Sequence, residues 1–385
     1  MIRNRKGRAM SKEITIQPVQ SKRDLKKFIL FPWKIYKGDP NWVPPLIMEM
    51  KKMFDPKKNP FFQHAEVENF LAYRDGEIVG RISAIINDNH NEFHNEKTGF
   101  FGFYESVNDL EVARTLIGTA AEWVKDRGMD RLRGPMNFST NDTCGLLVDG
   151  FDSPPVVEMT YNPPYYADLF EKAGLKKVKD LYAYYMDDST PISPKIERIA
   201  NILKKRHNVT VRSINMKKLR EELDLVKIVY NDAWSKNWGF VPLTDAEIDY
   251  IADQLKTIVD PELAIFAFVN GEVAGFSVSL PDFNQALIKI NGRLFPFGLF
   301  KLLWYSRKID MIRVFIMGVR EKFRHIGLDA IFYYETYMRG TRKGYHKGEF
   351  SWILEDNYRM RNTLEKMGAR IYKTYRIYDL EFSDQ

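Results

Sequence analysis

The chain has 385 residues, of which 44% are apolar and 28% are charged, and 58 Lys and Arg against 51 Asp and Glu give a formal net charge of +7. This balance excludes a disordered or collagen-like chain and indicates a globular protein. At roughly 100 to 200 residues per domain, the length favours two domains over one long domain. Acidic and basic residues are interleaved, so the mild positive charge permits an anionic ligand but does not favour nucleic acid as a partner.

Several features bear on the cellular compartment. Residues 1–11 are basic and lack an apolar core, so we expect a flexible tail rather than a secretory signal. No stretch approaches the roughly 20 apolar residues of a membrane-spanning helix. The single cysteine, Cys144, cannot form an internal disulfide, and we expect a structural thiol in a reducing compartment. These features predict a cytoplasmic protein that at most touches the inner face of a membrane.

An internal repeat organises the chain. Segment 71–85 matches segment 266–280, and each carries an Asp-Gly or Asn-Gly dipeptide typical of a β-hairpin with a type I′ turn. Near the end of each half, segment 170–184 matches segment 364–378, and both read as a helix, a glycine stop and a strand. Because the two matches have nearly the same offset, we predict two copies of one α/β unit.

The repeat predicts where the copies begin and end. We expect an N-terminal domain over 12–189 and a C-terminal domain over 190–385, with the boundary near the Ser/Pro-containing stretch 189–194. The first copy carries an insertion at 133–166, and the second carries an apolar insertion at 286–308. Insertions at different points of a duplicated scaffold are sites where function diverges, since loops tolerate change.

Each copy also predicts a strand followed by a helix. In the first copy we expect a strand over 99–106 and an amphipathic helix over 108–127, with Asn108 as its N-cap in a capping box. In the second copy we expect a strand over 309–319 and a helix over 328–339.

The turn between that second strand and its helix is basic and contains Gly327. A turn of this kind at a helix N-terminus points backbone N–H groups, and the positive end of the helix dipole, at an anion such as a pyrophosphate. The alternative is an ordinary turn with solvated basic residues. The order of elements around it, hairpin, strand, basic loop, helix, strand and an Asn-led helix, favours the anion site.

At these residues the chain resembles the GNAT superfamily of acyl-CoA-dependent N-acyltransferases, whose fold is a mixed central β-sheet flanked by helices. The family loop reads Q/RxxGxG/A, and here it is Arg324, Gly327 and Asp329, with Asp departing from the pattern in the last place. The family's closing Asn and Gly, eleven residues apart, appear as Asn357 and Gly368. The resemblance implies tandem GNAT-like domains and an acyl-CoA donor.

The resemblance assigns CoA binding to the second copy. In the first copy, Asp109 and Glu111 stand where a diphosphate would lie, and like charges would repel it. The residues implied in CoA binding are Gly318, Val319, Arg324, His325, Ile326, Gly327, Leu328, Asp329 and Asn357. Segments 90–105, 133–155 and 161–166 further resemble a bacterial tandem-GNAT group that includes the bacterial ceramide synthases.

The resemblance also frames the chemistry. A neutral amine attacks a thioester, an oxyanion needs hydrogen-bond donors and a thiolate leaves. Many family members protonate the thiolate with a Tyr seven residues after the Asn, but here that position is Leu364, so Tyr358 and Tyr161 are the substitutes we consider. For the general base we favour Glu158 or Asp142.

The insertion at 133–166 is the predicted acceptor site, with Asn137, Asn141 and Asn162 as substrate-binding residues. The alternative is a turn-rich loop whose Asn and Asp side chains cap local backbone. Glu355 and Asp356 are a second choice of base and equally fit the start of the helix that follows.

Two further motifs remain. His90 and His94 are four residues apart, but no third ligand accompanies them, and we predict no metal site. The stretch 294–305 is apolar with basic residues at its edges. It fits a peripheral membrane contact or the mouth of an acyl groove, and it equally fits an ordinary buried segment.

The sequence therefore predicts an acyl-CoA-dependent N-acyltransferase that transfers an acyl group to a primary amine. We expect a long-chain acyl group, and a sphingoid or other lipid amine as the acceptor. A Fem-type aminoacyl-tRNA-dependent transferase is the first alternative, although such enzymes do not need a CoA diphosphate loop. A non-catalytic acyl-CoA-binding protein is the second.

Overall fold

A computed structural model describes residues 13–190 and 193–382. The predicted basic tail 1–11 lies outside the described residues, and so do residues 191 and 192 of the predicted boundary. Within these ranges no helix combines the length and apolarity needed to cross a membrane.

The first half alternates strands and helices. Its elements are β1 (Thr15–Pro18), α1 (Lys22–Leu30), α2 (Pro32–Ile35), α3 (Ile47–Met53), the 3-10 helix η1 (Pro60–Gln63), β2 (Ala65–Arg74), β3 (Glu77–Asn87), α4 (Asp88–His94), β4 (Thr98–Ser106), α5 (Leu110–Lys125), β5 (Arg131–Gly134), β6 (Leu146–Asp149), α6 (Tyr166–Lys172) and β7 (Lys176–Asp187).

The second half repeats this order with its own additions. Its elements are α7 (Pro194–Arg206), β8 (Val209–Ser213), η2 (Met216–Lys218), α8 (Leu219–Trp234), α9 (Asp245–Leu255), η3 (Pro261–Leu263), β9 (Ala264–Val269), β10 (Glu272–Pro281), α10 (Asn284–Leu287), α11 (Gly298–Ser306), β11 (Met311–Val319), η4 (Glu321–Ile326), α12 (Leu328–Arg342), β12 (Lys347–Leu354), α13 (Tyr358–Lys366) and β13 (Arg370–Glu381).

The predicted hairpins are confirmed. Asp75 and Gly76 turn between β2 and β3 with φ of 56° and 78°, and Asn270 and Gly271 turn between β9 and β10 with φ of 50° and 83°. Two successive positive φ angles define the type I′ turn, which Asp, Asn and Gly tolerate best.

The predicted helix of the first copy is confirmed as α5, but its predicted cap is wrong by one residue. Asp109, not Asn108, is the N-cap, and its carboxylate accepts hydrogen bonds from the backbone N–H groups of Glu111 and Val112. Both residue types are good N-caps, so the sequence pattern alone does not choose between neighbours. Asp109 is favoured over Asn108 as the N-cap because Arg74 of β2 pairs with the Asp109 carboxylate at 2.7 Å.

All strands belong to one mixed sheet. The hydrogen-bonded order is β1-β2-β3-β4-β5-β13-β7-β12-β11-β10-β9-β8, and β6 pairs separately with β13. Among the strands of residues 13–190 and 193–382, only β4 with β5 and β11 with β12 pair in parallel. The predicted α/β class with tandem GNAT-like units is confirmed, but the two units share a single continuous sheet.

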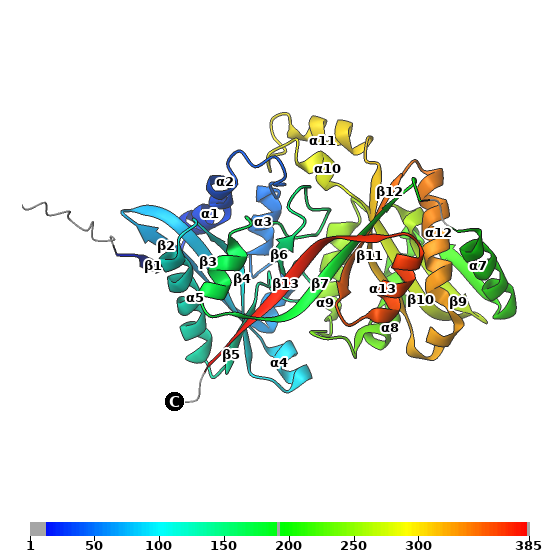
Figure 1. Cartoon of the computed structure of the whole chain (residues 1–385), viewed down its shortest axis with the longest axis horizontal. Helices are drawn as coiled ribbons and strands as arrows, with labels where there is room; N and C mark the ends of the chain where they lie inside the picture. The colour runs from blue at the N-terminus through cyan, green and yellow to red at the C-terminus, as the bar shows by residue number, and fades with distance from the viewer. Residues whose placement is uncertain (1–12, 191–192, 383–385) are drawn as a thin grey trace, which may run out of the picture.

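The sheet is continuous because the halves exchange their closing strands. β13, the last strand of the second half, pairs with β5 of the first half through Tyr378–Gly134 to Glu381–Arg131. β7, the last strand of the first half, pairs with β12 of the second half. The two long strands also pair with each other and cross the middle of the molecule side by side (Figure 1). We call this arrangement the strand exchange.

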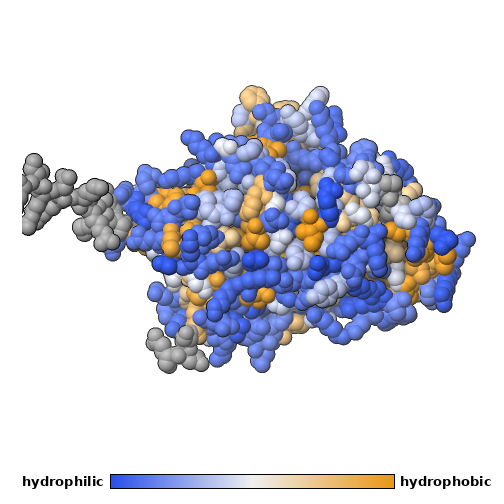
Figure 2. Space-filling view, in the orientation of Figure 1, coloured by the Kyte–Doolittle hydropathy of each residue, from blue (hydrophilic) through white to orange (hydrophobic). Residues whose placement is uncertain are grey.

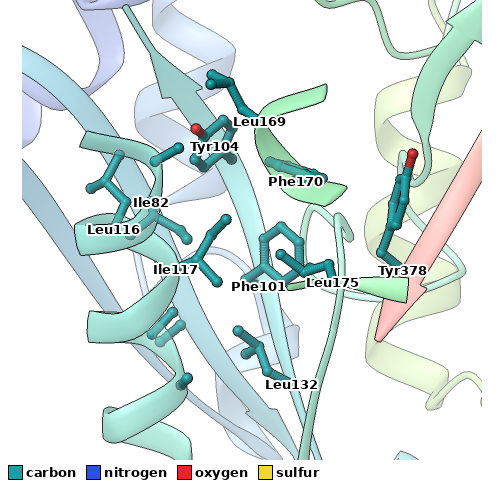
Figure 3. Packing of buried hydrophobic residues seen from close by; sticks show 14 of the residues in the cluster. Ile82, Phe101, Tyr104, Leu116, Ile117, Leu132, Leu169, Phe170, Leu175 and Tyr378 are labelled. Atoms are coloured by element: carbon teal, nitrogen blue, oxygen red, sulfur yellow. The ribbon is translucent and has the colours of Figure 1, made fainter. Parts of the chain in front are cut away.

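The strand exchange carries side chains into the other half's core. Tyr378 of β13 is fully buried in the first-half cluster, beside Phe170 of α6 at a ring distance of 5.7 Å. Figure 3 shows Tyr378 facing Phe170 and Leu175, with Leu116 and Ile117 of α5 on the far side of the cluster. A central cluster likewise contains Met311 of β11 and Ile377 of β13 together with first-half residues.

The insertion 133–166 meets the second half directly. Asn141 donates through its amide to the Val241 carbonyl at 3.1 Å, and Tyr230 of α8 donates to the Asn141 Oδ1. Thr140 donates to the Gly239 carbonyl. The first-half insertion is therefore fixed against the segment that joins α8 to α9.

Candidate functional site

The two parallel strands of the second half separate at one end. Met311 to Val314 of β11 pair with Lys347 to Phe350 of β12, and beyond that point β11 continues only against β10 while β12 continues against β7. Gly318 and Val319, which the resemblance implies in CoA binding, lie beyond the Val314–Phe350 pair. There Trp234 of α8 covers Gly318, since a Cβ on Gly318 would lie 2.1 Å from its ring.

The predicted phosphate loop leads into α12. It forms η4, and then Gly327 turns the chain into the helix with a φ of 84°. Gly327 is the N-cap, and among the described residues no side chain caps this helix. The first N–H groups of α12 are thus left to solvent or to a ligand, because helix geometry gives them no intrahelical acceptor.

The side chains of the loop have separate roles. Arg324 donates to the carbonyls of Ala233 and Val319, so it ties the end of α8 to the loop. Ile326 and Leu328 are buried in the second-half core, whereas His325 is exposed. Asp329, the departure from the family pattern, lies 3.7 Å from the Arg359 guanidinium, which offsets its charge at the helix start.

The equivalent positions of the first half are closed. Asp109 caps α5, and Arg74 pairs with both Asp109 and Glu111. Glu105, which occupies in β4 the place that Gly318 occupies in β11, is buried and accepts hydrogen bonds from the hydroxyls of Tyr36 and Tyr166. Burial raises the pKa of Glu105 to about 7.

The two predicted bases lie near each other in the insertion. Burial raises the pKa of Asp142 to about 7, and the charges of Glu247 and Glu158 act in the same direction. Ser139 donates to the Asp142 carboxylate at 2.9 Å. The Glu158 side chain is exposed, yet desolvation by the surrounding protein raises its pKa.

The backbone at Glu158 is strained, and hydrogen bonds to Arg313 and Asp282 fix it in this conformation. Its φ is 57°, in the left-handed region that costs energy for a non-glycine residue. Arg313 of β11 donates to the carbonyls of Val157 and Glu158 at 2.7 and 2.8 Å. Asp282, at the end of β10, accepts from the Val157 N–H at 2.8 Å.

Arg313 belongs to a buried polar group that sequence reasoning missed. Its guanidinium lies 3.6 Å from the Glu349 carboxylate and donates to the hydroxyl and the carbonyl of Ser351. Glu349 is fully buried, and burial raises its pKa to about 7 although Arg313 opposes the rise. The available signal was one charged residue inside each of two apolar strands, since a charge there is buried only when it is paired.

The predicted acceptor asparagines use their amides within the protein. Asn137 accepts from the Phe103 N–H and donates to Thr143. Asn162 accepts from and donates to the backbone of Leu147. Together with the Asn141 contacts described above, these bonds fix the shape of the insertion.

The remaining predicted residues are dispersed. Tyr161 donates to Asp39 at 2.9 Å, on the first-half side of the insertion. Tyr358 is 65% exposed at the start of α13, where Asn357 is the N-cap and accepts from the Met360 N–H. Glu355 and Asp356 pair with lysines of β7, at 2.8 Å each. Leu364, at the family's Tyr position, is fully buried in the core.

The histidine pair and the single cysteine lie apart from any metal-binding arrangement in the part of the chain that the structure describes. Within residues 13–190 and 193–382, no group of three or more His, Cys, Asp and Glu side chains is arranged to hold a metal ion. The His90 and His94 ring centroids lie 4.5 Å apart with the rings tilted by 40°, and burial lowers the pKa of His90 to about 4. Cys144 is buried, and burial raises its pKa.

The interpretation of 294–305 as an ordinary buried segment is wrong. Every residue of α11 is at least partly exposed, and Phe295, Phe297 and Phe300 are 78%, 70% and 71% exposed. The helix forms a protrusion at the top of Figure 1, and apolar colours appear at the tip of the same protrusion in Figure 2. Lys308 lies over the rings of Trp304 and Tyr305.

Comparisons with known proteins bear on the fold. The chain matches no protein-family model. A tandem GNAT protein from the clavulanic acid biosynthesis pathway superposes with a TM-score of 0.57 at 12% identity, over 97% of this chain and 100% of that one. A GCN5-related N-acetyltransferase from Sphaerobacter thermophilus gives a TM-score of 0.52 at 13% identity, over 96% and 95%.

Two curated proteins are similar in sequence along their whole length. Protein YghO of Escherichia coli (strain K12) is 38% identical over 366 residues, 93% of each chain. The bacterial ceramide synthase of Caulobacter vibrioides is 38% identical over 378 residues, 95% of this chain and 97% of the relative. At this identity and coverage, the two relatives show that the chain belongs to the family of the bacterial ceramide synthase, and the solved structures show that it has the tandem GNAT fold.

Proposed function

We propose that the protein is an acyl-CoA-dependent N-acyltransferase that transfers a long acyl chain to a lipid amine. The tandem GNAT fold supports acyl transfer to nitrogen in general. The single observation that carries the donor assignment is the N-terminus of α12, which follows Gly327 at a φ of 84° and has no side-chain cap among the described residues. The N–H groups there and the helix dipole suit the CoA diphosphate.

CoA binds to the second half alone in this proposal. The first half has the same strand–helix junction, but the Asp109 carboxylate occupies its helix N-terminus. Glu105 takes the place of Gly318, where a thioester would need a free backbone. Two carboxylates at the corresponding positions disfavour a second anionic cofactor.

Glu158 is the proposed general base, with Asp142 as the alternative. The amine nitrogen forms a bond to the thioester carbonyl carbon while the base accepts the amine proton, and collapse of the oxyanion breaks the C–S bond and releases CoA thiolate. The exposed Glu158 carboxylate, its raised pKa and its strained backbone support this role. A thiol with a pKa near 8.5 leaves without an acid, which suits the apolar Leu364.

A lipid acceptor is supported by two observations. A relative at 38% identity over 95% of this chain is named a ceramide synthase. The exposed aromatic and aliphatic side chains of α11, with Lys301, Arg307 and Lys308 beside them, suit a peripheral contact with an anionic membrane surface, from which such an amine would be drawn.

Calorimetry with acetyl-CoA and palmitoyl-CoA tests the donor site. We compare Gly327→Ala with Gly344→Ala, since Gly344 has a similar φ of 88° at the other end of α12. Both variants place an alanine at a positive φ and should lose about 1 to 2 kcal/mol of stability, but only Gly327→Ala should lose affinity for CoA esters. Equal affinities in the two variants, or no CoA ester bound by wild type, would overturn the assignment.

Turnover is followed as free thiol released from palmitoyl-CoA when a long-chain amino alcohol is added. Release that depends on the amine supports the transferase. Tight binding without release would favour the non-catalytic acyl-CoA-binding alternative. No thiol release, together with aminoacylation of the amine and release of free tRNA when an aminoacyl-tRNA is supplied, would favour the Fem-type alternative.

A further inference from the structure

A pocket lies between α12 and the parallel strands of the second half. Its inner part is lined by buried apolar side chains from four elements and a neighbouring loop. These are Met186 of β7, Ile312 and Val314 of β11, Tyr333 of α12, Phe350 of β12 and Met367. Its outer part is polar, with Asp188 and His346 paired at 2.9 Å.

The pocket exists because α12 covers less of the sheet than its counterpart does. In the first half, α5 packs against β3, β4 and β5, whereas α12 makes its main sheet contacts with β10 and β11. Val124 of α5 fills the space above Gly99, where an added Cβ would lie 2.5 Å from it. In the second half the large and the small residue exchange places. The glycine, Gly340, is on the helix α12, and it faces the larger Ile312 on the strand β11. The side of β12 that faces α12 is thus left open beside Phe350.

The inner end of the pocket lies at the separation of the strands. Val314 and Phe350, which line it, form the last pair of the β11–β12 ladder. The thioester of the proposed function, placed at Gly318, lies about 13 Å further along β11, four residues beyond Val314 at roughly 3.3 Å each. An acetyl group does not span that distance, whereas a fatty acyl chain does.

The opposite side of the sheet is unsuitable for hydrocarbon at the same level. Arg313 and Glu349, paired across β11 and β12, are buried there, with Ser351 hydrogen-bonded to the guanidinium. An apolar chain gains nothing by displacing these partners, because unpaired buried charges are costly.

We propose that this pocket, about 50 Å³ in volume, holds the last few carbons of the donor's long acyl chain. The inference rests on the proposed function, because the chain enters from the thioester site. The polar outer end, at Asp188 and His346, sets an upper limit to the chain length that the pocket accepts.

The test is the binding of a series of saturated acyl-CoA esters, from acetyl to eicosanoyl, by calorimetry. Wild type should bind more tightly with each added methylene, by up to about fourfold for each one fully buried, until an optimum is reached. Thr336→Phe, at a buried position of α12 that lines the pocket, should shift the optimum to shorter chains and weaken palmitoyl-CoA binding at least tenfold. Acetyl-CoA affinity should not change.

Met338→Phe is the matched control, because Met338 is on the same helix, is 46% exposed and lies outside this pocket. An unchanged chain-length profile in folded Thr336→Phe would overturn the pocket and leave the proposed function intact. Failure of wild type to bind acetyl-CoA and palmitoyl-CoA alike would overturn the proposed function and the pocket with it.

A measurement on wild type removes dependence on folding of the variant. Palmitoyl-CoA with a photoreactive diazirine near the chain end is irradiated in the complex, and the labelled peptides are identified. Labels on α12, β12 or the end of β7 support the pocket. Labels confined to α11 or to the insertion 133–166 would contradict it.

Discussion

At the scale of single residues, Glu158 and Asp142 compete for the role of base. We expect Glu158→Gln to lower kcat about 100-fold or more, as loss of a general base does, while Asp142→Asn has a smaller effect because Ser139 already binds that carboxylate. Steady-state kinetics with both variants checks this. KM for the acyl-CoA should not change, since neither residue lies in the CoA loop.

The pH dependence of kcat gives a second test of Glu158 as the general base. The base must be ionised to act, so wild-type kcat should fall as the pH drops through the raised pKa of Glu158, and the remaining activity of Glu158→Gln should lack this acidic limb. A limb that is lost in Asp142→Asn and kept in Glu158→Gln would assign the base to Asp142.

Glu349 makes a prediction about stability. Its folded-state pKa, about 7, lies above its ordinary value of 4.5, so ionisation of the buried carboxylate favours unfolding. The wild type therefore loses about 1.4 kcal/mol per pH unit between pH 4.5 and 7, and no more above that window. Glu349→Gln should gain stability relative to wild type across the same interval, by up to about 3 kcal/mol. Urea denaturation of both proteins at pH 5, 6, 7 and 8 measures it, and a constant difference would contradict it.

At the scale of elements, α11 predicts membrane binding that is separable from folding. Replacing Phe297, Phe300 and Trp304 by Ser should reduce co-sedimentation with phosphatidylglycerol vesicles at least tenfold, since each buried aromatic ring contributes about 1.5 to 3 kcal/mol. The melting temperature should stay within a few degrees, because these side chains are exposed in the folded protein.

The control for α11 replaces exposed apolar residues elsewhere. Met48, Ile202 and Ile228 are 55%, 53% and 48% exposed, and their replacement by Ser should leave vesicle binding unchanged. Equal loss in both triple variants would mean that no single helix carries the contact.

Elements with a local cause could be predicted from the sequence. The hairpin at Gly76 follows from two residues that accept positive φ, and α5 follows from its apolar stripe, although its cap is Asp109 and not the predicted Asn108. The turn at Gly327 into α12 was also predictable, because a glycine before a helical pattern marks such a turn, while phosphate binding by this loop stays a prediction. Arg313 and Glu349 were not, because their pairing depends on the register of two strands.

At the scale of the molecule, the strand exchange could not be predicted. β7 and β13 come from matching segments, so each has the same pattern of burial whether it closes its own half or the other. The hydrophobic pattern fixes which face of a strand is buried and leaves open which edge it joins. For the same reason, the sequence could not predict that Tyr378, a residue of the second half, is buried in the first-half core.

The strand exchange predicts that a destabilising substitution in β13 lowers the stability of the first half. Tyr378→Ala should cost about 3 to 5 kcal/mol, as truncation of a buried aromatic side chain does. Hydrogen exchange should show lost protection in α6, whose Phe170 packs against Tyr378, and in β5, which pairs with β13. Ile371→Ala, on the same strand at a position 38% exposed, is the control. Lost protection confined to the second half would contradict the exchange.

The strand exchange also sets an order of events during synthesis on the ribosome. β7 ends at residue 187 and β13 at residue 381, so at about 5 to 20 residues per second the first half waits roughly 10 to 40 s for the strand that completes it. Through that interval β5 presents a free edge, which is the kind of surface that draws intermolecular strand pairing. The nascent chain therefore depends on chaperones, or on temporary pairing of β7 with β5, until its own last strand arrives.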